Sequence, residues 1–359
     1  MVMERKIKRA FFLLSWVFLI VNVQATESYK KDVVVSDARL LVFPDNKREP
    51  FLNAIQNAQK SIQLAAYKLS DLAIMEALKK AAAERDVTID IFYEPNIFKH
   101  SRQGAQTSDL DALKSERIRI HTHSDRFNQI HHKLLIIDGK KALIGTINFD
   151  EESFDGIAGE DGQKENAPCR DFAIETDDPQ ILQELTQVFN ADLKDQPVTY
   201  QHPALVWGPH TQRMKILALI ESAQKNIDLY QQDIQDKGIL RALKAAIARG
   251  VRIRLLMMPY PFDKDKKKDN NISHQNELIQ AGGHVGLLTE FYGHAKAMLI
   301  DGRDLNKARL YVGSTNFYTP SLDENRELGI IVSDHTAVTD FSHVFEQDWS
   351  KSQKNILRE

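Results

Sequence analysis

The sequence has a single cysteine and only a small excess of acidic over basic residues. Its single cysteine, Cys169, excludes an internal disulfide, so the core has to be stabilised by burial alone. A chain of 359 residues that is 42% hydrophobic is long and apolar enough for that. Its 47 lysines and arginines against 50 aspartates and glutamates create no general field that would attract a polyanion. Nucleic acid would therefore have to be held by a local patch.

Only one long apolar run is present, and it lies near the N-terminus. A basic start precedes the apolar residues 10–21, and Val23-Gln24-Ala25 then offers a cleavage point before Thr26. The run is short for a membrane span, which needs about 20 residues, so we predict that residues 1–25 are a secretory signal peptide. An uncleaved anchor is the alternative. No later stretch approaches the length of a membrane span, and we expect an exported protein, periplasmic or secreted, that is soluble or peripheral.

The rest of the chain contains one block twice. Residues 51–93 align without a gap onto residues 216–258, at an offset of 165. A duplication of this kind predicts that each half is one structural unit. We therefore expect an N-terminal lobe over residues 26–200 and a C-terminal lobe over residues 201–359, with the connection near residues 187–203.

Helical and strand periodicities alternate within each half. In the first half we predict helices at 49–58, 73–84 and 110–115 and strands at 61–66, 87–92, 118–122, 131–137 and 142–146. In the second half we predict strands at 226–230 and 251–257 and helices at 237–248 and 337–350. Strands that alternate with helices are typical of α/β folds, so we predict two homologous α-β-α sandwich lobes related by a pseudo-twofold axis.

A short motif occurs once in each half. The pattern His-x-Lys-x4-Asp-Gly begins at His131 and at His294, and a Gly-x-x-Asn element follows it, ending at Asn148 and at Asn316. On an extended strand alternate side chains share a face, so each His and its Lys should point the same way. Neutral imidazole is a competent nucleophile or base, with an unperturbed pKa of about 6.5. Two such sets that face each other would bind one phosphate group between them.

This duplicated motif resembles that of the phospholipase D superfamily, and the resemblance covers nearly all of the chain after residue 25. It implies a two-step phosphodiester exchange that needs no metal or other cofactor. One histidine attacks phosphorus to give a phosphohistidine, and the other protonates the leaving alcohol and then activates water or another alcohol. The resemblance implies that His131 is the nucleophile and His294 the acid and base. It also implies which groups bind the phosphate oxygens: Lys133, Lys296, Asn148 and Asn316.

Acidic residues recur at matching places after the motifs. Arg170-Asp171 and Arg326-Glu327 each begin an apolar stretch. A carboxylate on the second ring nitrogen fixes the tautomer of a histidine and stabilises the imidazolium, so we predict that Asp171 and Glu327 orient the two rings. Asp138 and Asp301 end the motif strands. By analogy with the superfamily, they orient backbone and neighbouring side chains and do not touch substrate.

Three further histidines, His121, His123 and His132, lie near the first motif. They have no coherent set of carboxylate or thiol partners in the sequence, so we predict no metal site. Because neighbouring residues of a strand point to opposite faces, His132 should point away from His131.

The halves differ in two segments. Residues 150–166, inserted between Asn148 and Asp171, are acidic and contain three glycines, so we predict a flexible loop at the rim of the cleft. Such a loop would favour an amine-bearing headgroup over a long polyanion, although an ordinary solvated loop has the same composition. Residues 260–268 place aromatics beside lysines, which suits a lipid interface, a nucleic-acid backbone or an ordinary charged loop.

Taken together, the sequence predicts a monomeric two-lobed phosphodiesterase. The first hypothesis is a phospholipase D that cleaves the headgroup of glycerophospholipids at a membrane surface and leaves phosphatidic acid. The alternative is a metal-independent nuclease of the same superfamily, acting on DNA or RNA. Phosphatidyl transfer, as in cardiolipin synthesis, ranks lower because those relatives usually carry membrane spans. A binding module with a vestigial site is a third hypothesis, and both intact histidines argue against it.

Overall fold

The computed structural model describes residues 35–358, except residue 36, residues 98–109, residue 124, residues 159–163 and residues 260–270. The predicted signal peptide and the aromatic and lysine-rich segment therefore lie outside the described residues. Within the described parts of the chain, no helix is both long and apolar enough to cross a membrane.

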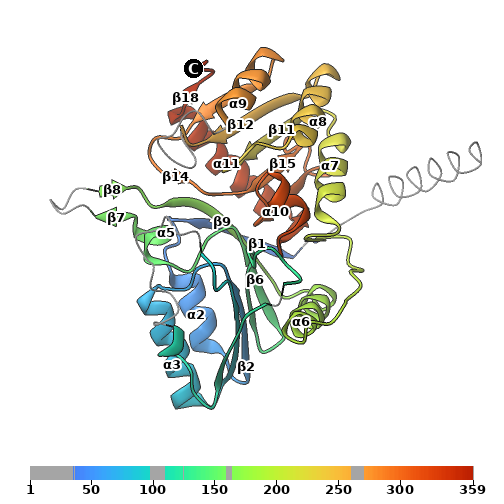
Figure 1. Ribbon diagram of the computed structural model, residues 1–359. Helices are drawn as coiled ribbons and strands as arrows, with labels where there is room; N and C mark the ends of the chain where they lie inside the picture. The colour runs from blue at the N-terminus through green and yellow to red at the C-terminus, as the bar shows by residue number, and fades with distance from the viewer. Residues whose placement is uncertain are drawn as a thin grey trace, which may run out of the picture.

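The chain forms two α/β lobes stacked end to end, each built on a mixed sheet (Figure 1). In the first lobe the strand order is β1-β9-β6-β5-β2-β3-β4. The bounds are β1 Ala38–Phe43, β9 Cys169–Thr176, β6 Lys141–Gly145, β5 Lys133–Ile137, β2 Ser61–Ala66, β3 Thr88–Tyr93 and β4 Ile118–His121. Helices α2 (Glu49–Asn57) and α3 (Leu72–Arg85) cover one face of this sheet, and α6 (Pro179–Leu193) lies on the other side (Figure 1).

The second lobe repeats the same order of strands, β10-β17-β16-β15-β11-β12-β13, with β18 added at the edge. Its strands are β10 Leu205–Trp207, β17 Leu328–Val332, β16 Arg309–Gly313, β15 Ala297–Ile300, β11 Asn226–Tyr230, β12 Arg252–Met257, β13 His284–Leu287 and β18 Gln353–Lys354. Its longer helices are α7 Gln212–Ser222, α8 Lys237–Ala248, α9 Asn271–Gln280 and α11 His335–Lys351. The prediction of two homologous α/β lobes is confirmed.

Equivalent capping residues start the same helix in both lobes. The side chain of Asp71 accepts the Ile74 N–H at the start of α3, and that of Asp236 accepts the Ile239 N–H at the start of α8. One arginine per lobe binds this aspartate: Arg48 is 2.5 Å from Asp71 in the first lobe and Arg213 is 3.0 Å from Asp236 in the second. The two arginines are also 165 residues apart, so the repeat extends before residue 51.

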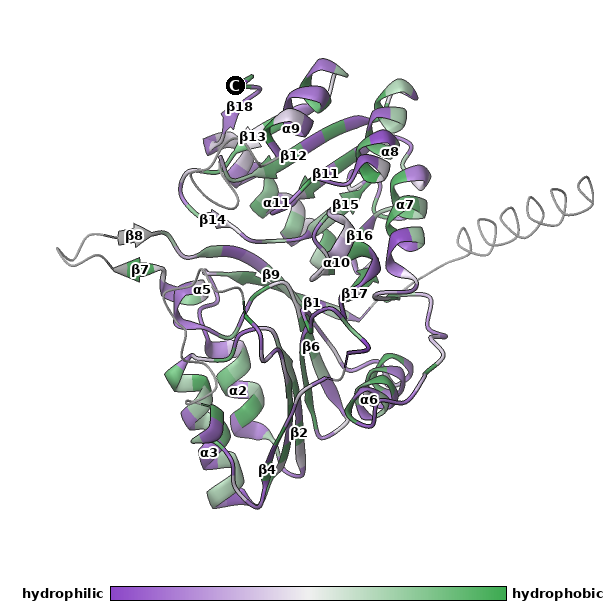
Figure 2. Ribbon diagram, viewed as in Figure 1, coloured by the Kyte–Doolittle hydropathy of each residue, from purple (hydrophilic) through white to green (hydrophobic). Residues whose placement is uncertain are grey.

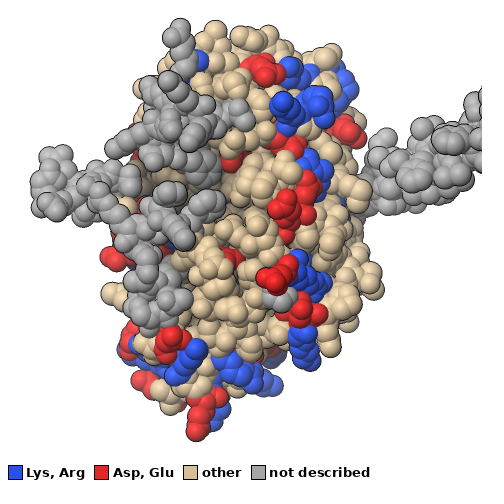
Figure 3. Space-filling model, in the orientation of Figure 1, with Lys and Arg blue, Asp and Glu red and all other residues tan. Residues whose placement is uncertain are grey.

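The apolar core crosses the junction between the lobes. Buried residues of α6 and of one face of the first sheet belong to the same cluster as the core of the second lobe, whereas the face under α2 and α3 forms a separate cluster. Figure 2 shows the central strands of the first sheet as mainly hydrophobic, with mixed colours on the helices that cover it. Outside the grey atoms, Figure 3 shows acidic and basic side chains interspersed on the visible face, as the balanced composition predicts.

Each lobe pairs a short piece of its backbone with the acid-bearing segment of the other lobe. Strand β14 (Tyr292–Gly293), just before His294, pairs in parallel with Cys169 and Arg170 of β9. Ile130, just before His131, forms the corresponding parallel bridge with Arg326. The backbone N–H groups of His131 and His132 both bind the Arg326 carbonyl. This corrects the prediction of a strand from residue 131: β5 begins only at Lys133, because the preceding backbone pairs with the other lobe.

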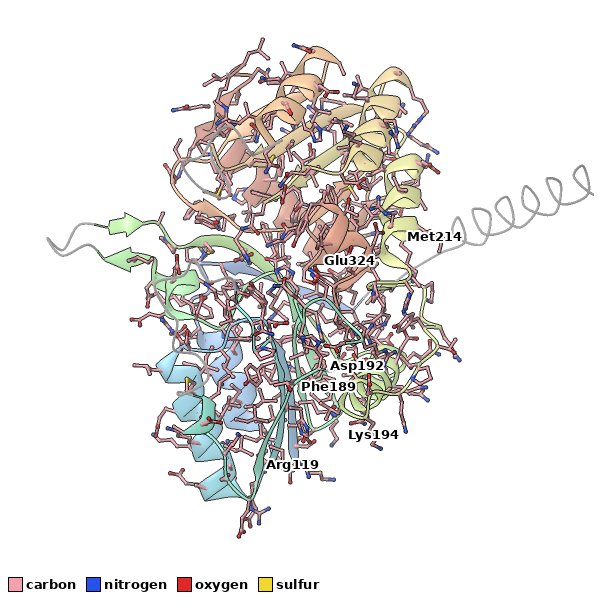
Figure 4. All side chains as sticks on the ribbon, viewed as in Figure 1. Arg119, Phe189, Asp192, Lys194, Met214 and Glu324 are labelled. Atoms are coloured by element: carbon pink, nitrogen blue, oxygen red, sulfur yellow. The ribbon has the colours of Figure 1, made fainter. Side chains whose placement is uncertain are left out.

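Two buried ion pairs fasten the same interface. Arg170 of the first lobe is 2.7 Å from Asp348 of α11, and Arg326 of the second lobe is 2.7 Å from Asp192 of α6. Asp192 is labelled on α6 in Figure 4, on the side of the helix toward the second lobe. Each arginine directly precedes one of the predicted orienting acids, so these pairs also fix the segments that carry the acids.

The described parts of the acidic insertion contain a helix and two short strands, which the prediction of a loop did not include. Asp150 is buried and caps a short helix, α5 (Glu151–Asp155), which a hairpin of β7 (Ile157–Ala158) and β8 (Lys164–Asn166) follows. Lys68 lies 3.4 Å from Asp150, and Arg48 lies 2.6 Å from Asp155. These contacts neutralise part of the predicted negative field. The predicted connection is also shorter, because α6 continues to Leu193.

We predict that Asp192→Asn lowers the free energy of unfolding by about 3 kcal/mol, because it leaves the Arg326 guanidinium buried without its charged partner. The matched control is Glu277→Gln in the half-exposed pair with Lys244, which should change that free energy by less than about 1 kcal/mol. Guanidinium unfolding followed by circular dichroism measures both. Equal effects of the two substitutions would show that the interlobe pair contributes no more than a surface pair.

Candidate active site

His131 and His294 lie at the junction of the lobes, and a carboxylate of the opposite lobe binds each ring. Nδ1 of His131 is 2.9 Å from a Glu327 oxygen, and Nδ1 of His294 is 2.9 Å from an Asp171 oxygen. All four side chains are buried. Because Nδ1–H donates to a carboxylate, the lone pair of each neutral ring is on Nε2. The two motifs thus present two reactive nitrogens within one interface.

A hydroxyl fixes each of these carboxylates in turn. Thr146 Oγ1 donates to Asp171, and Ser314 Oγ donates to Glu327. Each hydroxyl also accepts the backbone N–H that follows its acid, at 3.0 Å in the first lobe and 3.1 Å in the second. Thr146 and Ser314 occupy the second position of the two Gly-x-x-Asn elements. Their place in the repeat marks them, although sequence reasoning assigned them no role.

Lys133 and Lys296 bring two ammonium groups into the same buried region. Nζ of Lys133 donates to the His131 carbonyl, and Nζ of Lys296 donates to the His294 carbonyl at 2.5 Å. Burial and the charge of Lys296 lower the pKa of Lys133 to about 7, and burial lowers the pKa of Lys296 to about 8. Because buried like charges repel, the site favours an anionic ligand that both cations can contact.

Asn148 and Asn316 follow β6 and β16 and are also buried. Their amide oxygens have no hydrogen-bond partner among the described residues. A buried amide with unused hydrogen-bonding capacity at a reactive site is suited to a ligand. The next residue of each lobe, Phe149 or Phe317, forms a bridge to the segment after β2 or β11 and so fixes the position of the asparagine.

Asp138 and Asp301 lie at the other end of the motif strands, about seven residues from the histidines, which is roughly 23 Å of extended chain. Asp138 accepts the backbone N–H groups of residues 59–61, with the closest at 2.7 Å. Asp301 accepts those of residues 224–226 in the same way. The structure therefore places both aspartates where they fix the backbone between a helix and a strand, away from the imidazoles.

Burial lowers the pKa of both His131 and His294 to about 4, although the paired carboxylates act in the opposite direction. Each ring is therefore neutral near pH 7, which suits a nucleophile. A phosphate anion next to the rings would raise both pKa values, because negative charge stabilises the imidazolium. Ligand binding and protonation are consequently coupled in this site.

Sequence reasoning missed an aromatic partner of one histidine. The rings of Tyr67 and His131 meet edge to face, with centroids 4.9 Å apart, and Lys133 Nζ lies 5.3 Å from the Tyr67 centroid. The equivalent residue of the second repeat is Gln232, so this contact belongs to one half of the site. The difference between the aligned repeats is the signal that could have revealed it.

The other histidines of the first lobe have structural partners. His121 lies 2.8 Å from Asp90, and His123 lies 3.2 Å from Glu94. His132 is buried against Trp207, with ring centroids 6.4 Å apart, and burial lowers its pKa well below the usual value. Among the residues that the structure describes, no group of three His, Cys, Asp or Glu side chains is placed to hold a metal ion.

Two homologous lobes that join one His-Lys motif each at a common interface define a member of the phospholipase D superfamily. Residues 51–193 and 216–349 both match the family described as "Cardiolipin synthase, PLD-like domain". The chain belongs to this family.

Individual relatives are distant. The chain is 24% identical to cardiolipin synthase A of Pseudomonas fluorescens over 350 residues, which cover 89% of this chain and 70% of that one. It is 23% identical to the minor cardiolipin synthase ClsB of Bacillus subtilis, covering 89% and 82%. The probable cardiolipin synthase YwiE of Bacillus subtilis is 29% identical, but the match covers 62% of this chain and 46% of YwiE.

Solved structures show the same fold at low sequence identity. The phosphatidylserine synthase of Haemophilus influenzae matches with a TM-score of 0.66 and 11% identity, covering 90% of this chain and 88% of that one. The polyphosphate kinase of Porphyromonas gingivalis matches with a TM-score of 0.63 and 17% identity, covering 89% of this chain and 52% of the kinase.

We predict that an anion which does not itself titrate, such as sulfate, binds with uptake of protons at pH 6. The free imidazoles have pKa values of about 4 and are mostly neutral at that pH, and the bound anion raises these values. Affinity should therefore fall as pH rises from 5 to 7, by up to about tenfold per unit for one proton. Titration calorimetry in buffers of different ionisation enthalpy measures the uptake.

The control for this titration is His294→Asn, which should take up fewer protons than the wild type because one of the two coupled rings is absent. Affinity that is independent of pH, with no buffer-dependent heat, would contradict the coupling.

Proposed function

We propose that this protein exchanges the headgroup alcohol of phospholipids through a covalent phosphohistidine on His131. The observation that carries the proposal is the pair of buried imidazoles, His131 and His294, each oriented by a carboxylate of the other lobe and accompanied by a lysine. These groups suffice for in-line displacement at phosphorus: a nucleophile, an acid and base, and cations for the phosphate oxygens.

In the first step Nε2 of His131 attacks phosphorus and the bond to the headgroup oxygen breaks. His294, protonated once the anionic phosphodiester is bound, gives its Nε2 proton to the leaving alkoxide, which departs as a neutral alcohol. Glu327 holds the Nδ1 proton of His131 and stabilises the positive ring as the phosphorus–nitrogen bond forms. Lys133 and Lys296 neutralise the charge on the non-bridging oxygens.

In the second step the roles of His294 reverse. Its neutral Nε2 takes a proton from an incoming hydroxyl, whose oxygen attacks phosphorus and displaces His131. Water as the acceptor gives phosphatidic acid, and an alcohol gives a new phosphodiester. Asp171 holds the Nδ1 proton of His294 throughout, so Nε2 can both donate and accept.

The choice of His131 as nucleophile rests on the superfamily resemblance and on the contact with Tyr67, which makes the two imidazole environments unequal. His294 then serves as the acid and base. Asn148 and Asn316 would orient the phosphodiester through their amides, whereas Asp138 and Asp301 act on the backbone.

Phospholipid is the substrate class that the relatives favour, because the family description and the curated relatives refer to cardiolipin synthases and one structural neighbour is a phosphatidylserine synthase. These names also favour transfer to an alcohol over the hydrolysis that the sequence suggested first. We propose a protein that works as a monomer at a membrane surface, since both motifs meet within one chain, and that is exported by its N-terminal segment.

We predict that vesicles of phosphatidylglycerol, incubated with the protein and EDTA, give cardiolipin and glycerol if an alcohol resolves the intermediate, and phosphatidic acid and glycerol if water does. His131→Ala and His294→Ala should each reduce turnover on the order of 10³-fold, because each removes a group that reacts with the substrate. The control is His343→Ala, an exposed histidine of α11. Mass spectrometry of the lipids gives the products.

A parallel arm uses single-stranded DNA in place of vesicles. Cleavage of DNA with no lipid product would replace the proposed function with the nuclease alternative. Turnover that survives either alanine variant would exclude the two-histidine mechanism.

A further inference from the structure

The two orienting carboxylates accept different numbers of hydrogen bonds. Among the residues that the structure describes, Asp171 accepts one hydroxyl in addition to its histidine, that of Thr146. Glu327 accepts two hydroxyls, from Ser314 and from Ser321 at 2.6 Å. The amide of Asn325 adds a longer contact of 3.4 Å. The site is therefore symmetric in its motif residues and asymmetric in the groups that bind its two acids.

The additional hydroxyl occupies an equivalent position in the two repeats but makes different contacts. Ser321 is the fifth residue after Asn316, and Ser153 is the fifth residue after Asn148. Both are buried. The Ser153 hydroxyl interacts with Cys169, whereas the Ser321 hydroxyl reaches Glu327. The second lobe also has a glutamate where the first has an aspartate, and the extra methylene gives its carboxylate a longer reach.

A buried glutamine, Gln212, binds the backbone of Ser321. The side chain of Gln212 donates to the Ser321 carbonyl at 2.5 Å and accepts the Thr315 hydroxyl at 2.7 Å. The aligned residues of the first lobe are Lys47, which is exposed, and Ile147, which has no hydroxyl. Ser321 Oγ also accepts the Asn316 backbone N–H at 2.9 Å, so one hydroxyl joins the phosphate-binding loop to the carboxylate behind His131.

Hydrogen-bond donors disperse the charge of a carboxylate and make it a weaker acceptor for a neighbouring imidazolium. We propose that Ser321 is a positioning residue that holds Glu327 as a weakly basic anion. Glu327 then stabilises a protonated His131 ring only weakly, so His131 stays neutral and serves as the nucleophile. Asp171 accepts fewer hydrogen bonds from the described residues, so its partner His294 is the ring that takes up the proton. This inference rests on the proposed function and supplies the physical reason for its unequal roles.

The other charged groups that face the two rings do not distinguish them. Lys133 of β5 and Lys296 of the second motif act on both imidazoles, and both lower the pKa of each ring. The charge on Glu327 raises the pKa of His131, as that on Asp171 raises the pKa of His294. Apart from the uncharged ring of Tyr67 against His131, the donors that act on the two acids are thus the feature that differs.

The test compares Ser321→Ala with Ser153→Ala and Ser321→Thr. The His131 ring is titrated by NMR of histidine-labelled protein, with His131→Asn used to assign the signal. Ser321→Ala should raise the pKa of His131 by about half to one unit, because Glu327 loses a donor and binds the imidazolium more strongly. Ser153→Ala should leave this pKa unchanged, and Ser321→Thr should restore it because the hydroxyl is kept.

Turnover gives a second readout. In Ser321→Ala the acid limb of kcat/KM against pH should move to higher pH by the same amount, since His131 must be neutral to attack. A merely structural role in the Asn316 loop would lower kcat without moving this limb. If Ser321→Ala does not fold, Thr315→Val, which removes one anchor of Gln212, should raise the same pKa by a smaller amount.

The inference would be overturned if His131 had the same pKa in Ser321→Ala and Ser153→Ala, or if its pKa were lower in Ser321→Ala. Lack of lipid turnover in the wild type would instead overturn the proposed function, and the NMR titration would still decide the role of Ser321.

Discussion

The hydrogen bond between a histidine of one lobe and a carboxylate of the other is the interaction on which the rest of the molecule depends. Glu327, directly before β17 of the second sheet, binds His131, and Asp171 of β9 in the first sheet binds His294. The motif histidine and the orienting carboxylate of one lobe are therefore not partners of each other, because each binds a residue of the other lobe. The exchange of backbone pairs across the junction is what brings each ring to its acid, and a continuous apolar core keeps that junction closed.

Burial makes this arrangement costly and also reactive. In a region of low dielectric constant an unpaired charge is strongly disfavoured, and paired charges interact strongly. At the interface most buried charges therefore have partners: Arg170 and Arg326 form ion pairs, and hydroxyls donate to both acids. Its lysines are the exception, because burial brings their pKa values close to neutrality. An anionic phosphodiester relieves that cost, so substrate binding and full charging of the site should occur together.

Much of the fold could be predicted because it depends on periodic and repeated features. The strands at 61–66 and 226–230 and the helix at 237–248 agree with the structure residue for residue. The sequence predicted that Asp171 and Glu327 orient the rings, but not which acid binds which ring. A contact across a pseudo-twofold axis leaves no periodic signal along the chain. The strand start at Lys133 was missed for the same reason. The helix α5 was obscured by an acidic, glycine-rich composition, although Asp150 is a favourable N-cap.

Duplication gives this site two chemically similar halves, but displacement at phosphorus needs two unlike ones. A nucleophile must be neutral when the substrate arrives, and an acid must carry a proton at the same moment. Identical environments would give both rings the same average protonation. The state with a neutral His131 and a protonated His294 would then be populated equally with the state in which the two are exchanged. Differences in the residues around the motifs can remove that degeneracy without altering the motifs themselves. Tyr67 against one ring and Ser321 behind its carboxylate are such differences, and both act on His131.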